Sequence, residues 1–159
     1  MSLRSRCASE VVKAALEGVR ERADIHYSQM LALRWSGIDR KLLKTQPPYA
    51  DCSAYATWLM WRARVKVRGN AGADIVNGQS WTAGYTGTQI QHGRKHRSTT
   101  SSRLYKAGRT LVFYGEGAAI SHVAIYVGNG MVVSHGSEAG PLLLPFNYRK
   151  VREARAYPL

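Results

Sequence analysis

The order of patterns along the sequence predicts an α+β fold, in which amino-terminal helices pack on a small antiparallel sheet formed by the second half of the chain. Apolar residues recur at helical spacing in residues 9–23 and again from residue 51 onward. Residues 110–136 instead contain three short runs of β-branched and aromatic residues. The sequence has no internal repeat and no interdomain linker, so residues 1–159 are expected to form a single domain.

Two helices are expected before the sheet. The first is predicted over residues 9–23, with Ser9 as its cap. Residues 27–49 lack a long period and end in two prolines, which is typical of a loop. The second helix is predicted to begin after Asp51, whose carboxylate would cap it. Cys52 then lies in the first turn of this helix.

The strands are predicted at residues 110–115, 121–128 and 131–136, with a final edge strand in residues 151–159. Asn129-Gly130 between two apolar runs is a strong hairpin signal. If these two residues form the turn and the pairing is regular, His122 and His135 lie on one face of the sheet. Ser134 then points to the opposite face. A slip of one residue would exchange the two positions.

The placement of Cys52 suggests an activated sulfur nucleophile. Two cysteines are too few for a disulfide framework or a zinc site, and Cys7 has no evident partner. The start of a helix favours thiolate over thiol. His122 would be the base and His135 would orient its ring, while the N–H of Cys52 and neighbouring amides at the helix start would stabilise an oxyanion. A buried structural cysteine with two unrelated histidines is the alternative interpretation.

The net charge of +13 and the pI near 10.2 predict attraction to a polyanion. Basic residues are densest in residues 93–109, which read as an exposed loop. No nucleic-acid-binding motif is present, and no nucleic-acid partner is expected.

His92 and His96 have the spacing of helical metal ligands but lack further ligands, so neither a metal nor a cofactor is expected. No run reaches membrane-spanning length, and a monomer is expected.

Two segments carry a resemblance to a known family. The segment "DCSAYATWLMW" resembles the helix start of the NlpC-type cell-wall peptidases, a papain-like family, and "GRTLVFYGEGAAISHVAIYVGNGMVVSHG" resembles the family's strand and hairpin. The resemblance covers residues 49–136. It implies a papain-like fold, with Cys52 as nucleophile, His122 as base and His135 as the orienting residue. Further similarity in "GYTGT" and "SHGSEAGP" is to the peptidase domains of lysins from phages of actinobacteria.

The resemblance implies an endopeptidase that cuts an amide bond in the peptidoglycan stem peptide, with the γ-D-glutamyl to diaminopimelate bond as the expected target, through an acyl-thioester. Anionic wall polymers would then be the partner of the basic surface. The amino terminus does not read as a secretory signal, so synthesis in the host cytoplasm and release onto the wall are expected. The alternatives are an N-acetylmuramoyl-L-alanine amidase, a papain-like toxin, deamidase or acyltransferase, and a non-catalytic basic module that binds nucleic acid or wall polymers.

The sequence departs from the family at two places. The third catalytic residue of the family usually follows the catalytic histidine by twelve positions, which is Ser134 here. The regular pairing of the predicted hairpin instead favours His135. The family also has a tyrosine shortly before the cysteine, for which Tyr27 is the candidate and Tyr49 the competitor. Other candidate substrate-site residues are Asp51, Ser53, Trp81 and Tyr85, the last two in a glycine-rich loop where an anchoring role is equally consistent.

Overall fold

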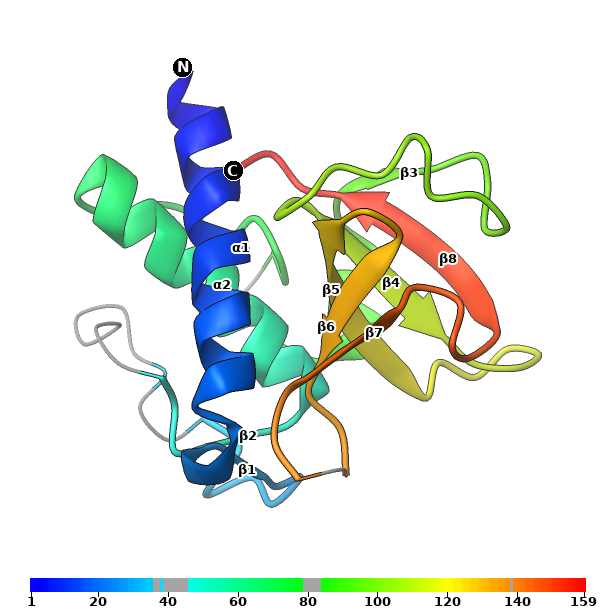
Figure 1. The fold of residues 1–159 in the computed structure, drawn as a ribbon, viewed down its shortest axis with the longest axis horizontal. Coiled ribbons are helices and arrows are strands. Elements are labelled where there is room, and N and C mark those ends of the chain that lie inside the picture. Colours follow the sequence, from blue (N-terminus) through cyan, green and yellow to red (C-terminus); the bar gives the residue numbers. More distant parts are fainter. Residues whose placement is uncertain (36–37, 39–45, 79–83, 138) are drawn as a thin grey trace.

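Two long helices lie beside a strongly twisted antiparallel sheet in the computed structural model, which describes residues 1–35, 38, 46–78, 84–137 and 139–159 (Figure 1). The helices are α1 (Leu3–Arg20), α2 (Cys52–Arg68) and the one-turn α3 (Thr86–Gln89), with a 3₁₀ turn at Arg22–Asp24. A parallel ribbon pairs β1 (His26–Tyr27) with β2 (Tyr49–Ala50). The large sheet contains β3 (Arg94–Lys95), β4 (Thr110–Tyr114), β5 (His122–Gly128), β6 (Met131–Ser134), β7 (Leu142–Pro145) and β8 (Val151–Ala156). Among the described residues, no helix is both long and apolar enough to cross a membrane.

Both expected helices form, and the bounds of the first were wrong. Helix α1 begins at Leu3 because Ser2 caps it, accepting a hydrogen bond from the Ser5 amide at 3.1 Å. Its buried face therefore starts upstream of residue 9, at the fully buried Cys7. Helix α2 begins at Cys52 as expected, and Asp51 accepts a hydrogen bond from the Ala54 amide at 2.8 Å.

The sheet has the strand order β3-β8-β4-β5-β6-β7. The expected edge position of the last strand was wrong, because β8 pairs with β4 on one side and with the two-residue β3 on the other. Strand β7, which follows the predicted hairpin, forms the opposite edge and was not expected. The three strands predicted in residues 110–136 are present as β4, β5 and β6.

Both faces of the sheet are buried. One face packs against α1 and α2 through Leu111, Phe113, Val123, Ile125 and Val133. The other is covered by the loops before β4 and around β7 and β8, and contributes Val112, Tyr114, Ala124, Tyr126, Val132 and Ala154. Residues that alternate along β5 therefore point into two separate apolar layers. Any polar side chain on this strand needs a partner inside one of these layers.

The predicted register of the β5–β6 hairpin was wrong beyond its first pair. Asn129 and Gly130 have positive φ values of 54° and 73° and form the expected tight turn, so Gly128 faces Met131. A bulge follows, since Tyr126 then pairs with Val132 and leaves one residue of β5 without a partner. Every later side chain on β6 is thereby moved to the other face.

Candidate active site

The start of helix α2 meets the start of strand β5 at Cys52. The backbone N–H groups of Val123 and Ser53 donate hydrogen bonds to the Cys52 sulfur. Only 8% of the Cys52 surface is exposed, and this burial, together with the nearby Asp51 carboxylate, raises the pKa of the thiol to about 11. Cys52 is therefore a thiol at neutral pH, and forming its thiolate would require a base.

His122, the first residue of β5, directly precedes the Val123 amide that contacts this sulfur. Its Nε2 atom lies 2.7 Å from the Ser134 Oγ atom, and that hydroxyl lies 2.9 Å from the hydroxyl of Tyr148. The Tyr114 ring stacks on the imidazole with centroids 5.9 Å apart. His122 is thus buried and held by a chain of hydroxyl groups on one face of the sheet.

The prediction that His135 shares the face of His122 was wrong. The bulge in β5 moves His135 to the helix side of the sheet and brings Ser134 to the His122 side. The Nε2 atom of His135 lies 3.0 Å from the carbonyl oxygen of Ala50 and 3.3 Å from that of His26. Since carbonyl oxygens only accept hydrogen bonds, Nε2 carries the proton and donates. His135 therefore fastens the β1–β2 ribbon to the end of β6.

The ribbon places Tyr27 near Cys52. Tyr27 pairs with Ala50, two residues before Cys52, and its hydroxyl accepts a hydrogen bond from Gln29 at 2.8 Å. Burial raises the pKa of Tyr27, and the proximity of Cys52 raises it further. The competing Tyr49 lies one residue earlier in β2 and packs its ring against His26. Tyr27 is consequently the tyrosine that the fold brings to Cys52.

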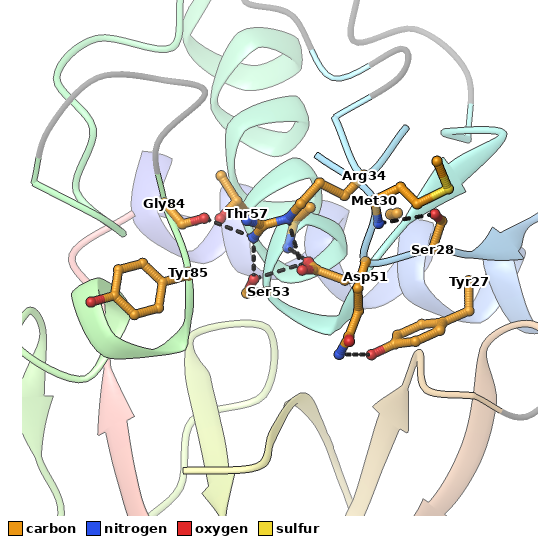
Figure 2. A network of polar contacts seen from close by, with 12 residues as sticks. Tyr27, Ser28, Met30, Arg34, Asp51, Ser53, Thr57, Gly84 and Tyr85 are labelled. Carbon is orange, nitrogen blue, oxygen red and sulfur yellow. Dashed lines mark hydrogen bonds and ion pairs between the residues drawn. The ribbon is translucent and has the colours of Figure 1, made fainter. Parts of the chain in front are cut away.

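Arg34 links the segments around the helix start, and the sequence reasoning missed it. Its guanidinium forms an ion pair with Asp51 at 2.8 Å and donates to the Ser53 hydroxyl and the Gly84 carbonyl, both at 2.9 Å. Figure 2 shows the arginine reaching over both side chains toward Gly84. The Ser53 hydroxyl also donates to Asp51 at 2.9 Å. The side chains of Asp51 and Ser53 thus belong to this network, and the Ser53 amide contacts the Cys52 sulfur.

The remaining sequence candidates are placed differently. Trp81 lies outside the described residues. Tyr85 precedes α3 and is 53% exposed, with its backbone amide bonded to the Thr88 hydroxyl. No group of three or more metal-ligating side chains occurs in the part of the chain that the structure describes. His92 contacts the Thr88 carbonyl and His96 the Thr110 hydroxyl, so the two histidines have separate partners.

The sequence matches the model of the NlpC/P60 family over residues 32–145, which is more than half of the chain. The chain belongs to the NlpC/P60 family. Members of this family are cysteine peptidases that act on peptidoglycan. No curated protein matches the sequence significantly.

Solved structures share the NlpC/P60 papain-like fold. NlpC2 from Trichomonas vaginalis superposes with a TM-score of 0.57 at 19% identity, over 93% of this chain and 47% of that protein. The NlpC/P60 domain of the peptidoglycan hydrolase SagA gives 0.55 at 21% identity, over 91% of this chain and 97% of that domain. The peptidoglycan hydrolase RipB from Mycobacterium tuberculosis gives 0.51 at 20% identity, over 93% and 65%. The chain thus spans about half the length of the Trichomonas protein.

Proposed function

We propose that this NlpC/P60 protein is a cysteine endopeptidase that hydrolyses an amide bond in the peptidoglycan stem peptide. The observation that carries the proposal is the meeting of a helix-start thiol with the first residues of β5. There the Cys52 sulfur accepts a hydrogen bond from the Val123 amide. His122, the residue before Val123, is held by a hydrogen bond with the Ser134 hydroxyl. A nucleophile, a neighbouring imidazole and a group that orients the imidazole are the parts needed for acyl transfer through sulfur.

The proposed triad is Cys52, His122 and Ser134. The His122 imidazole carries its proton on Nε2 and donates it to the Ser134 hydroxyl, so its Nδ1 atom is unprotonated and acts as the base. The Ser134 hydroxyl also lies 2.9 Å from the hydroxyl of Tyr148. In this proposal the two hydroxyl groups hold His122 in the tautomer that accepts the thiol proton.

In the proposed reaction the Cys52 sulfur attacks the amide carbon while His122 takes the thiol proton. The Cys52 amide and the Tyr27 hydroxyl stabilise the resulting oxyanion. The carbon–nitrogen bond then breaks, His122 returns the proton to the leaving amine, and a thioester remains. Water, deprotonated by His122, hydrolyses the thioester and restores the thiol.

A cleft beside Tyr27 supports an acidic peptide as the substrate. It has a volume of about 290 Å³ and is lined by Arg22, Ala23, Ile25, His26, Tyr27, Ser137, Ala139 and Gly140. Arg22 and His26 supply the basic side chains of this lining. They suit the free carboxylates of a stem peptide, and we assign the γ-D-glutamyl to diaminopimelate bond as the target. Cleavage of the N-acetylmuramoyl-L-alanine bond is the alternative with the same catalytic residues.

We further propose that the protein acts as a lysin of phage type, reaching the wall after synthesis in a host cytoplasm. The net charge of +13 supports this role because the wall to be degraded is anionic. Turbidity measured on intact cells, with the protein added from outside and from inside, tests it. Lysis from neither side would refute the role without touching the peptidase proposal.

Digestion of purified walls, followed by mass spectrometry of the released fragments, tests the peptidase proposal. The parent protein is expected to release fragments with a new diaminopimelate amino group, and Cys52→Ala to release none above background. Cys7→Ala is the matched control, because Cys7 is a second buried cysteine that lies in α1. Equal release by the parent and Cys52→Ala would refute the proposal, whereas fragments with new L-alanine amines would identify the amidase alternative.

A further inference from the structure

A large open cleft lies apart from the residues that contact Cys52. Its volume is about 700 Å³, and its lining is Arg4, Ile75, His92, Gly93, Arg94, Arg109, Ala156 and Pro158. Three guanidinium groups therefore face one space, with a histidine at its wall. No carboxylate belongs to the lining.

The positive charge in this cleft is not neutralised by the protein. Among the described residues, no carboxylate pairs with Arg4, Arg94 or Arg109 within ion-pair distance. The pKa of Arg109 is lowered first by burial and then by the charges of Arg4 and Arg94, which places the three cations within electrostatic reach of one another. Like charges held together without a counter-charge cost free energy, and an anion bound among them would remove that cost.

Helix α1 adds to the positive potential at the cleft. Arg4 lies in its first turn, which contains no acidic residue to offset the helix dipole. The nearest acid on β8, Glu153, is already bound by Lys95 at 2.7 Å and by Arg155 at 2.8 Å. The local acid thus serves other cations and leaves the cleft basic.

Arg109 is positioned independently of any ligand. Its Nε atom donates to the Tyr157 carbonyl at 3.1 Å, which leaves the terminal guanidinium nitrogens to bind a ligand. Arg94 lies on the edge strand β3, and its side chain is exposed. A fixed arginine beside exposed ones on an open cleft is suited to the oxygens of a phosphate group.

We propose that this cleft is an anion-binding site that takes a phosphate group of a phosphodiester-linked wall polymer. This inference rests on the proposed action at the cell wall. It attributes polymer binding to this cleft, and not to the net positive charge of the whole protein. A wall polymer is favoured over nucleic acid because none of the cleft's lining residues is a phenylalanine, tyrosine or tryptophan on which bases would stack.

Co-sedimentation with purified walls tests the site, and all variants carry Cys52→Ala so that retention is measured without hydrolysis. Arg4→Gln with Arg94→Gln is compared with Arg103→Gln and Arg152→Gln, two exposed arginines outside the cleft whose loss lowers the net charge equally. The cleft pair is expected to weaken retention about tenfold or more, and the control pair only a few-fold. Equal losses in the two pairs would overturn the proposal.

Two further arms identify the ligand. Walls stripped of phosphodiester-linked polymer by hydrofluoric acid are expected to retain the parent and the cleft pair equally, whereas a difference that persists would overturn the assignment to phosphate. Inorganic pyrophosphate is expected to reduce the retention of the parent on untreated walls, but not the retention of the cleft pair. Tighter binding to duplex DNA than to walls, abolished by the same pair, would replace the wall polymer by nucleic acid. The variant with Arg4→Gln and Arg94→Gln but with Cys52 retained is also assayed for cleavage of soluble muropeptides. This assay separates failure of the anion site from failure of the proposed peptidase function.

Discussion

Removal of the Ser134 hydroxyl is expected to slow the reaction while leaving the protein folded. The hydroxyl lies 2.7 Å from the Nε2 atom of His122, and the ring becomes positively charged when it takes the thiol proton. A hydrogen bond to a charged group contributes about 1.5–3 kcal/mol, whereas one between neutral groups contributes about 1 kcal/mol. Ser134→Ala should therefore lower kcat/KM by roughly 10- to 150-fold and destabilise the fold by about 1 kcal/mol.

His135 provides the matched comparison, because it is an equally buried side chain on the neighbouring position. His135→Gln retains an N–H for the Ala50 carbonyl and is expected to keep kcat/KM within a few-fold. His135→Ala removes this donor together with a buried ring, and should lower the free energy of unfolding by about 2 kcal/mol.

The assay combines steady-state cleavage of a soluble stem-peptide substrate with thermal unfolding of each variant. Ser134→Thr, which keeps the hydroxyl, should recover most of the activity lost in Ser134→Ala. A larger kinetic loss in His135→Gln than in Ser134→Ala, with both proteins folded, would refute the assignment of Ser134. Equal activity of Ser134→Ala and the parent would show that the hydroxyl does not orient the base.

Three other predictions concern the surroundings of the nucleophile. In His122→Ala, iodoacetamide should alkylate Cys52 slowly at neutral pH and faster as the pH approaches about 11, because burial raises the thiol pKa; a rate that levels off below pH 8 would contradict this. Arg34→Gln should lower the free energy of unfolding by about 3 kcal/mol in denaturant titrations, since it breaks a largely buried ion pair. The control Lys66→Gln breaks a more exposed pair and should cost under about 1 kcal/mol; similar losses would argue against the network. Tyr27→Phe should reduce kcat by about a hundredfold without a change in thermal stability, and unchanged kcat would exclude its hydroxyl from the reaction.

The sequence predicted the helix that carries Cys52 because its start signal is local. Asp51 caps α2 through an amide three residues away, and such a contact depends only on nearby residues. Tyr27 was proposed from resemblance alone, since its place beside Ala50 depends on a pairing across more than twenty residues, and its role stays a prediction. The predicted placement of His135 on the face of His122 failed for a different reason.

The error arose from one inserted residue. The turn itself was correctly read from Asn129-Gly130, but Gly128 precedes it with a φ of 101°, and the pairing shifts there. A glycine inside a strand is a known sign of a bulge, so the signal was present in the sequence. Counting the bulge would have exchanged His135 for Ser134.

Arg34 and Tyr148 carried no comparable signal. Both reach the site through side-chain contacts between segments distant in sequence, Arg34 with Gly84 and Tyr148 with Ser134. The chain contains 23 lysines and arginines, so charge alone does not single out one arginine. Only the folded arrangement shows that Arg34 is held in an ion pair with Asp51, beside Cys52.

The bonds from His135 to Ala50 and His26 have a consequence for the order of folding. The β1–β2 ribbon has two residues in each strand, which is too little to persist in isolation. It is fastened by a histidine 109 positions after His26, and contacts of such separation form late because a long loop must first close. We therefore expect the chain segment that leads into Cys52 to become ordered only after the hairpin has paired in register. An incomplete or unfolded chain would then lack the arrangement around Cys52, which the completed sheet supplies last.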